Sequence, residues 1–311
     1  MGMESARLAL ACVLRPVLGR LPRGSDRAYR YVLGQYGSSY LSDPHFKRNL
    51  KRRYRIFLDR HVGCYVVADV GDCYSRNHYI TGRYYERFVP LLIRRLLDPG
   101  DTFIDVGANR GIHSMFAARF LERGRVVSFE PNPETFRVLQ AHITINGLTN
   151  CEPHNIGLSD EAGVLELRLL ADDHPTSCTF LDTGADVKQT FSVPIKRLDE
   201  VLGGDAPRGK MLVKVDAEGF DHKVIRGLGR LLDFDQLAIA TEVVDDWLRK
   251  TGSSAQALFS EMIDHGFLAF LPSVKKQLLT ERLHLEPLRR GLPAAGYHDI
   301  LFAKPGIAPE N

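Results

Sequence analysis

The chain has 311 residues, of which 44% are hydrophobic and 25% are charged, and its formal net charge is +3. These values are typical of a globular protein with one large domain, or with a core and a smaller cap, and so small a charge does not by itself imply a nucleic acid or a membrane as partner. The five cysteines are scattered and form no CxxC pair, which argues against a disulfide framework or a structural zinc site and predicts a reducing, cytoplasmic setting.

The first part of the chain, residues 1–97, is rich in Tyr and Arg and only weakly periodic, so we expect an N-terminal cap that is helical or irregular. Its apolar run Leu8–Leu18 is interrupted by Arg15 and Pro16, which predicts an amphipathic leader helix and no transmembrane segment. A targeting role or contact with a membrane surface is the alternative. The basic run Lys47–Arg55 predicts a solvated helix face, and contact with anionic substrates, RNA or lipid head groups stays open.

From about residue 98 to residue 311, apolar strand-like runs alternate with helix-like runs, which is the pattern of a parallel sheet. The predicted strands of this domain are Thr102–Val106, Arg125–Phe129, Asn155–Leu158, Leu212–Val215, Leu237–Thr241, Phe267–Leu271 and Ile300–Ala303, with an extra pair at Val164–Leu170 and Phe191–Ile195. The predicted helices are Ile112–Leu121, one that Asn132 caps and that runs to about Ile145, Phe220–Leu232, and one from about Ser254 to His265.

A glycine-rich segment, Asp105–Gly111, lies between the first predicted strand and the following helix. Gly107 and Gly111 are four positions apart and Asn109 stands where a dinucleotide fingerprint has its middle glycine, so the fit to that fingerprint is poor. Asp105 disfavours a pyrophosphate and suits a cationic ligand such as S-adenosylmethionine, which carries a sulfonium and an ammonium. The alternative is an ordinary strand-to-helix turn.

Glu130 ends the second predicted strand, 19 residues after Gly111, at the interval where a carboxylate accepts both ribose hydroxyls of a nucleotide. We also expect the cap residue Asn132 to contribute to the cofactor site. Ser159 and Asp160, at the exit of the third strand, could reach the adenine amino group, although a plain turn fits these two residues equally well.

Several segments of the chain resemble the FkbM-type methyltransferase family. They are Tyr84–Glu86, Asp105–Gly111 (DVGANRG), Phe129–Pro133 (FEPNP), Asn155–Asp160 (NIGLSD), Pro194–Leu202 (PIKRLDEVL), Val213–Phe220 (VKVDAEGF) and Ala240–Val243 (ATEV). The resemblance implies a Rossmann-like class I methyltransferase fold of the α/β class, with a seven-stranded, mostly parallel sheet that has one antiparallel strand. It also implies S-adenosylmethionine as cofactor and an oxygen acceptor, often on a sugar or a natural product. The N-terminal 75 residues and the tail after Pro272 lie outside the resemblance, and we expect acceptor choice to depend on them.

Charged residues alternate with valines where the fourth predicted strand ends: Lys214, Asp216 and Glu218. Alternation along a strand sends these three to one side, and ligands of such sheets bind beyond the carboxyl ends of the strands. Glu242 ends the neighbouring strand, so we expect a carboxylate cluster. Asp216 or Glu218 is predicted to take or orient the acceptor's proton, and Lys214 to tune them or to stabilise a developing alkoxide. The alternative is an ion-pair network at a strand end.

Further candidates are weaker. His222 is a second candidate base, although a surface histidine in the first turn of a helix fits better, and His113 could approach the cofactor or lie at a helix surface. Asp172–His174 could line the acceptor site or form a polar loop. Asp216, Glu218 and Glu242 could hold a divalent cation, but their spacing matches no known metal loop, so we predict no metal.

The sequence therefore predicts an S-adenosylmethionine-dependent methyltransferase that acts on a hydroxyl of a small-molecule or glycosidic acceptor, with no nucleic acid as the expected partner. The alternatives are an NAD-dependent oxidoreductase on a Rossmann fold, an RNA methyltransferase that uses the basic run, and a non-catalytic binding protein that keeps the fold.

Overall fold

A computed structural model describes residues 54–82, 84, 86–171, 178–203, 209–276, 281–292 and 296–308 of the chain. Its contacts divide the chain into two compact units. The smaller unit comprises Met1–Arg87 with Val274–Arg282, and the larger comprises Phe88–Ser273 with Leu283–Asn311. Among the described helices, none combines the length and the apolar character needed to cross a lipid bilayer. The predicted leader at Leu8–Leu18 and the polar segment Asp172–His174 lie outside the described residues.

The described residues before Phe88 form a β-hairpin followed by a helix, where we had expected helical or irregular structure. Strand β1 (Tyr54–Asp59) pairs with β2 (Cys64–Asp69) in antiparallel register, and α4 (Cys73–Thr81) follows. The buried Asp59 accepts a hydrogen bond from the ring of His78 at 2.6 Å, which ties the hairpin to α4. The last residues of the basic run, Tyr54 and Arg55, therefore begin a strand rather than lie on a helix.

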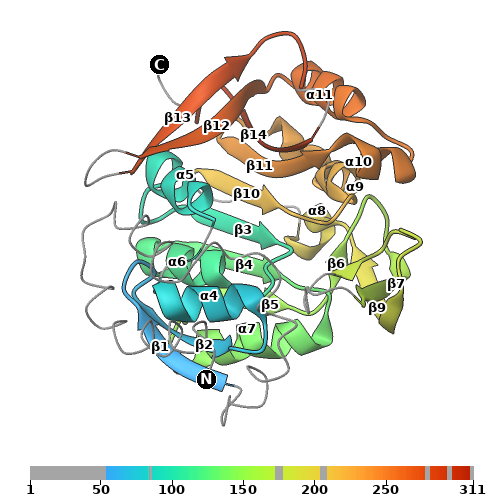
Figure 1. Cartoon of the computed structure of the whole chain (residues 1–311). Helices are drawn as coiled ribbons and strands as arrows, with labels where there is room; N and C mark the ends of the chain where they lie inside the picture. The colour runs from blue at the N-terminus through green and yellow to red at the C-terminus, as the bar shows by residue number, and fades with distance from the viewer. Residues whose placement is uncertain are drawn as a thin grey trace. The chain divides into compact units, whose positions relative to one another are not determined.

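The larger unit is built on an eight-stranded mixed sheet (Figure 1). In spatial order its strands are β13 (Glu281–Leu288), β12 (Leu268–Lys276), β14 (Tyr297–Ala303), β11 (Leu237–Val244), β10 (Met211–Val215), β3 (Thr102–Val106), β4 (Arg125–Phe129) and β5 (Cys151–His154). The five strands from β11 to β5 are parallel, and β14 is antiparallel to both β11 and β12. The α/β fold with a mostly parallel core is as predicted, but the expected count of seven strands is wrong, because β13 adds an eighth strand, whose residues are half-buried or exposed.

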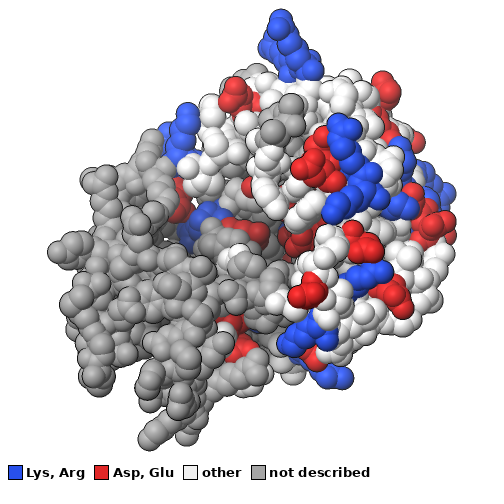
Figure 2. All heavy atoms as spheres, turned by 45° about the vertical axis from the view of Figure 1, so that its right-hand side comes forward, with Lys and Arg blue, Asp and Glu red and all other residues white. Residues whose placement is uncertain are grey.

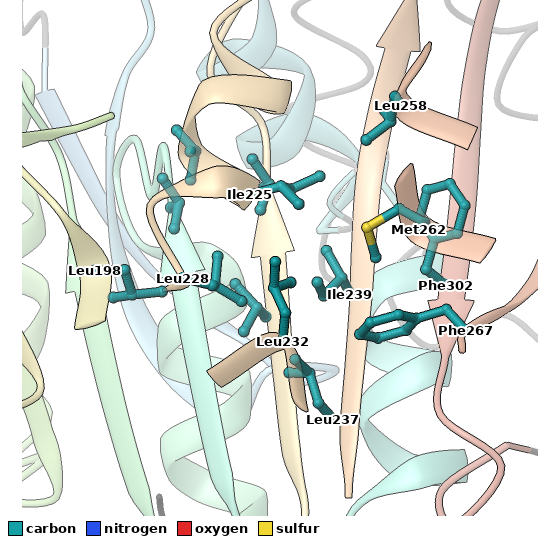
Figure 3. Close-up of a cluster of buried hydrophobic side chains, with 14 of the residues drawn as sticks. Leu198, Ile225, Leu228, Leu232, Leu237, Ile239, Leu258, Met262, Phe267 and Phe302 are labelled. Carbon is teal, nitrogen blue, oxygen red and sulfur yellow. The ribbon is translucent and has the colours of Figure 1, made fainter. Parts of the chain in front are cut away.

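Helices cover both faces of this sheet. They are α5 (Phe88–Leu96), α6 (Ile112–Phe120), α7 (Pro133–Ile145), α8 (Leu198–Val201), α9 (Asp221–Arg226), the 3-10 helix η2 (Gly229–Asp233), α10 (Asp245–Lys250) and α11 (Ala255–Asp264). Residues of α9, η2 and α11 pack on alternate residues of β10 and β11, such as Val213 and Ile239, and form one large apolar cluster (Figure 3). Side chains between those residues point to the other face, where α6 packs on β3 and β4.

Two predicted elements differ from the structure. The third core strand is Cys151–His154, and the predicted Asn155–Leu158 instead contributes Gly157–Leu158 to a separate sheet. The predicted helix Phe220–Leu232 breaks into α9 and η2, because Gly229 has φ +52° and Gly227 lies so close to the backbone of Ser159 that an added Cβ would meet its carbonyl oxygen at 2.1 Å.

A second, four-stranded sheet is inserted between β5 and β10. Its order is β6 (Gly157–Leu158), β9 (Val187–Lys196), β7 (Gly163–Leu170) and β8 (Cys178–Thr179). The antiparallel pairing of β7 with β9 confirms the strand pair that the sequence predicts within this segment. We call this the inserted sheet.

Candidate active site

A pocket opens at the carboxyl ends of β3, β4 and β10, where ligands of such sheets bind. The pocket is a small hollow that is partly open to solvent. Its walls come from the turn after β3, from Glu130 and Pro131 after β4, from Asp216, Ala217 and Glu218 after β10, and from the inserted sheet. The candidate residues predicted at the ends of these three strands therefore lie at or near one pocket.

The turn after β3, residues 107–111, is called the glycine turn here. Three of its residues have left-handed backbone angles: Gly107 at φ +69°, Asn109 at φ +51° and Gly111 at φ +77°. A Cβ atom added to Gly107 would lie 1.9 Å from the carbonyl oxygen of Asp216, so only glycine allows the turns after β3 and β10 to touch. Gly107 and Asn109 line the pocket, whereas Gly111 packs on Leu139 instead.

Glu130 lies in the pocket wall, as predicted for a residue that would receive ribose hydroxyls. Its two carboxylate oxygens each accept a backbone N–H at 2.8 Å, one from Asn109 and one from Asn132. Burial raises the pKa of the Glu130 carboxyl to about 7, and these two hydrogen bonds and Lys214 oppose that rise. Each oxygen keeps a second lone pair for a ligand hydroxyl.

A row of buried polar side chains crosses the sheet beneath the glycine turn. Lys214, Asp105 and Ser128 are register neighbours on β10, β3 and β4. Asp105 accepts a hydrogen bond from Ser114 of α6 at 2.5 Å, and its other oxygen lies 3.7 Å from the Lys214 ammonium. The Lys214 ammonium donates to the carbonyl of Gly107 at 3.0 Å and to Asp216 at 3.1 Å. Asp105 and Lys214 therefore support the pocket floor and are not among the side chains that line it.

The turn after β10, residues 216–219, is called the acid turn. Asp216 and Glu218 both line the pocket. Glu218 has a left-handed backbone at φ +49°, an uncommon conformation for any residue other than glycine, and one that clusters at functional sites. The pKa of its carboxyl is raised to about 8, first by burial and then by repulsion from Asp216, Glu242 and Asp221.

Asp221 lies two residues after the acid turn, and the sequence analysis did not single it out. It is buried at the start of α9, and its two oxygens accept the backbone N–H groups of Ala217 and Gly219, each at 3.0 Å. These bonds fix the backbone on both sides of Glu218. No local motif marked it, because an Asp side chain commonly accepts N–H groups of residues that follow it in the chain, and here it accepts those of preceding residues.

Glu242 lies on β11, one position beyond the register pair Val215–Thr241, and its charge acts on Glu218. The expected proximity of carboxylates at these two strand ends is therefore present. Among the described residues, no three His, Cys, Asp or Glu side chains are arranged to hold a metal ion.

Other predicted residues lie outside the pocket wall. Asn132 caps α7 and accepts from the N–H of Glu134 at 2.9 Å. The hydroxyl of Ser159 donates to Asp160 at 3.0 Å, and Asp160 lies 3.6 Å from the Lys223 ammonium. Neither Ser159 nor Asp160 lines the pocket. Their part in holding a cofactor stays a prediction.

The two histidines that we considered are both buried helix residues and neither lines the pocket. The ring of His222 binds the hydroxyl of Ser253 and, at 2.9 Å, the carboxylate of Glu261 on α11. His222 therefore joins α9 to α11, and the expectation of an exposed first-turn histidine is wrong. His113 is 4% exposed on α6, so the surface position considered for it is also wrong.

The inserted sheet supplies pocket residues that the sequence did not predict. Leu167 of β7, Cys178 and Thr179 of β8, and the following Phe180 all line the pocket. No local motif marks them, because only the tertiary fold brings this segment over the strand ends.

The chemistry of the lining fits a cationic nucleotide-like ligand. Glu130, Asp216 and Glu218 line the pocket, and the described lining contains no Lys or Arg. The charged side chains that line the pocket are all acidic, which disfavours a pyrophosphate and favours a sulfonium. Figure 2 shows basic and acidic residues interspersed on one face of the molecule, with no continuous basic field over the described residues of that face.

Comparison with known proteins gives a family and relatives. A model described as the methyltransferase FkbM domain matches residues 105–269. The chain is 30% identical over 149 residues to "Methyltransferase 1" of Beauveria bassiana (strain ARSEF 2860), which covers 42% of this chain and 59% of that protein. It is 29% identical over 162 residues to "Methyltransferase sdnD" of Sordaria araneosa, which covers 42% of this chain and 61% of that protein. The chain thus spans about three fifths of the length of these relatives.

A solved structure, the precorrin-6y C5,15-methyltransferase from Geobacter metallireducens GS-15, aligns with a TM-score of 0.38 at 15% identity, over 70% of this chain and 87% of that one. A likeness of this extent carries no information about the reaction.

Proposed function

The chain belongs to the FkbM methyltransferase family, and from this premise we propose that it is an S-adenosylmethionine-dependent enzyme that methylates a hydroxyl of a sugar, glycolipid or natural-product acceptor. One observation carries the proposal: a pocket at the carboxyl ends of β3, β4 and β10 whose charged lining residues are Glu130, Asp216 and Glu218, all acidic. We also propose a cytoplasmic location, which the scattered cysteines without a CxxC pair favour.

The glycine turn and Glu130 would hold the cofactor. The open backbone of Gly107 and Asn109 allows close approach, and the Glu130 carboxylate can accept ribose hydroxyls on the lone pairs that its two backbone partners leave. When bound, S-adenosylmethionine supplies an electrophilic methyl group, whose transfer to oxygen leaves a neutral thioether.

The acid turn would supply the base. An alcohol becomes a competent nucleophile as it loses its proton, and Glu218 is suited to receive that proton because its carboxyl has a pKa of about 8, close to neutral pH. The proton moves from the acceptor hydroxyl to the Glu218 carboxylate while the new carbon–oxygen bond forms. Asp216, paired with Lys214 at 3.1 Å, would orient the hydroxyl.

An aromatic pair beside the acid turn supports a hydroxylated acceptor with an apolar face. Trp247 of α10 lies against Gly219: a Cβ atom added to Gly219 would be 3.0 Å from the Cβ of Trp247. The ring of Tyr297 is 5.5 Å from that of Trp247 and the residue is 64% exposed. Aromatic faces pack on apolar ring surfaces while carboxylates accept from hydroxyls, the two kinds of surface that a sugar presents.

Calorimetry with S-adenosylhomocysteine tests the cofactor assignment. We expect saturable binding to the wild type and binding at least about tenfold weaker in Glu130→Gln, one lost charged hydrogen bond being worth about 1.5–3 kcal/mol. Glu134→Gln, which changes an exposed acid in the first turn of α7, is the matched control and should bind as the wild type does. Saturable NADH binding without S-adenosylhomocysteine binding would instead support the oxidoreductase alternative.

A methyl-transfer screen tests the acceptor class. Incorporation of labelled methyl groups into hydroxylated glycosides, glycolipids or polyketides is expected, and it should depend on Glu218. Incorporation into RNA alone, with a steep dependence on salt, would replace this proposal with the RNA alternative.

A further inference from the structure

The two-residue strand β8 connects both sides of the pocket. It pairs with β7 through Arg168 and Thr179. Its Cys178 thiol accepts a hydrogen bond at 3.1 Å from the side-chain amide of Asn132, whose backbone N–H in turn binds Glu130. Its Thr179 hydroxyl donates to the carbonyl of Glu218 at 3.2 Å. One short strand of the inserted sheet therefore contacts the end of β4 and the acid turn.

The Thr179 hydroxyl is held in a single orientation. Its oxygen accepts the backbone N–H of Leu181 at 3.0 Å, which directs its proton toward the carbonyl of Glu218. Thr179 itself is buried. A serine could make both bonds, whereas a valine of the same shape could make neither.

The conformation of Glu218 needs such support. A left-handed backbone at a residue other than glycine persists only where its surroundings fix it. Asp221 fixes the N–H groups on either side from α9, and Thr179 fixes the carbonyl of Glu218 itself from the inserted sheet. Leu181 completes the contact, because a Cβ on Gly219 would lie 2.6 Å from its side chain.

We propose that Thr179 is a positioning residue that holds the Glu218 carboxylate toward the pocket, so that the inserted sheet is part of the catalytic apparatus. This inference rests on the proposed role of Glu218 as base. The inserted sheet would then do more than cover the pocket, because its Thr179 would fix the orientation of the Glu218 side chain.

The test compares Thr179→Val and Thr179→Ser with Thr190→Val. Thr190 is the matched control, since it lies in the same sheet, pairs with the same Arg168 and is exposed. We expect Thr179→Val to lower kcat for the acceptor found in the screen by about tenfold, as befits one lost hydrogen bond, with S-adenosylhomocysteine affinity within about twofold of wild type. Thr179→Ser should restore kcat, and Thr190→Val should leave it unchanged.

A second readout needs no acceptor. In protein labelled with ¹³C at glutamate carboxyls, the NMR titration of Glu218, assigned with Glu218→Gln, should move by roughly half a pH unit or more in Thr179→Val and stay in place in Thr179→Ser. Should Thr179→Val not fold, Thr179→Ala removes the same hydroxyl without placing a second methyl group at that position. An unchanged kcat and titration, or a parallel loss of kcat and S-adenosylhomocysteine affinity, would overturn the inference.

These outcomes are separate from failure of the proposed function. In that case the wild-type protein itself would bind no S-adenosylhomocysteine and would methylate no acceptor.

Discussion

The glycine turn and the acid turn lie at the carboxyl ends of the neighbouring strands β3 and β10. The carboxylates beside them, Glu130 and Glu218, have opposite surroundings. Glu130, which follows β4, is bound to the glycine turn: its two buried oxygens accept the backbone N–H groups of Asn109 and Asn132. At the acid turn, Glu218 is surrounded by other carboxylates and held in a left-handed backbone.

This difference suits Glu130 to ligand binding and Glu218 to proton transfer. A carboxylate with fixed donors is a preformed receptor for hydroxyl groups, and its geometry matters more than its charge state. A carboxylate that its neighbours repel exchanges a proton near neutral pH, which a general base requires. Lys214 links the two turns, because its ammonium binds Gly107 and Asp216 together.

The largest expected effect is that of Glu218→Gln, which removes the base and keeps the shape of the side chain. We expect kcat to fall by about 10²–10⁴-fold, the usual contribution of a general base, because glutamine cannot take the proton. The affinity for S-adenosylhomocysteine should stay within about twofold. Glu161→Gln, an exposed acid in the turn before β7, serves as the control. If the affinity for S-adenosylhomocysteine fell as much as kcat, Glu218 would contribute to cofactor binding and would not act as the base alone.

The next largest effect concerns the contact between the turns. Gly107→Ala places a methyl group 1.9 Å from the carbonyl oxygen of Asp216, whereas Gly147→Ala, at a similar φ of +61°, meets nothing within 4 Å. Both variants carry the strain of a left-handed alanine, so their difference isolates the clash. We expect Gly107→Ala to lower the free energy of unfolding by about 1–3 kcal/mol more than Gly147→Ala, as measured by denaturant titration. Equal losses would mean that the turns are not in contact.

Much of this comparison could be predicted from the sequence, because it depends on local patterns. The glycine turn, Glu130 and the alternation of Lys214, Asp216 and Glu218 each follow directly from residue spacing at strand ends. The sheet core and the strand pair of the insertion were also predictable, since each strand is a short apolar run.

What the sequence did not show depends on packing between distant segments. The register of β10, β3 and β4 places Lys214, Asp105 and Ser128 side by side. Lys214 and Asp105 therefore interact with each other beneath the pocket and do not line it. Thr179 reaches Glu218, 39 positions away, only through the fold. The break between α9 and η2 arises from a close approach of Gly227 to Ser159, which no helical periodicity reveals.

A smaller effect should distinguish the two carboxylates by pH. Glu130 has a pKa of about 7, and its charged form is the better acceptor for ribose hydroxyls. The affinity for S-adenosylhomocysteine should therefore fall as the pH is lowered below 7, by at most about tenfold per pH unit, as expected for one linked proton. Calorimetry from pH 8 to pH 5.5 measures this, and Glu130→Gln should show a flat profile. A flat wild-type profile would mean that Glu130 does not contact the ligand.

The smallest effect is one of stability. Glu218 titrates at about pH 8 in the folded protein and near its ordinary value of about 4.5 when unfolded, so the native state binds the proton more tightly. Linkage then makes the stability of the wild type fall as the pH rises from about 4.5 to 8 and level off above. The neutral amide introduced by Glu218→Gln has no charge to bury, so the variant should gain stability relative to wild type across this window, by on the order of 1–2 kcal/mol once solvent screening is allowed for.

The same measurement on Glu130→Gln sharpens the contrast between the turns. Its pH-dependent gain should be smaller, because the pKa of Glu130 is raised only to about 7, and it should be offset by the loss of one of the two backbone hydrogen bonds that a glutamine amide cannot accept. Denaturant titrations at pH 5 and pH 8 measure both variants. Should Glu130→Gln gain more stability than Glu218→Gln, Glu130 rather than Glu218 would be the more destabilised carboxylate, and the proposed base would be wrong.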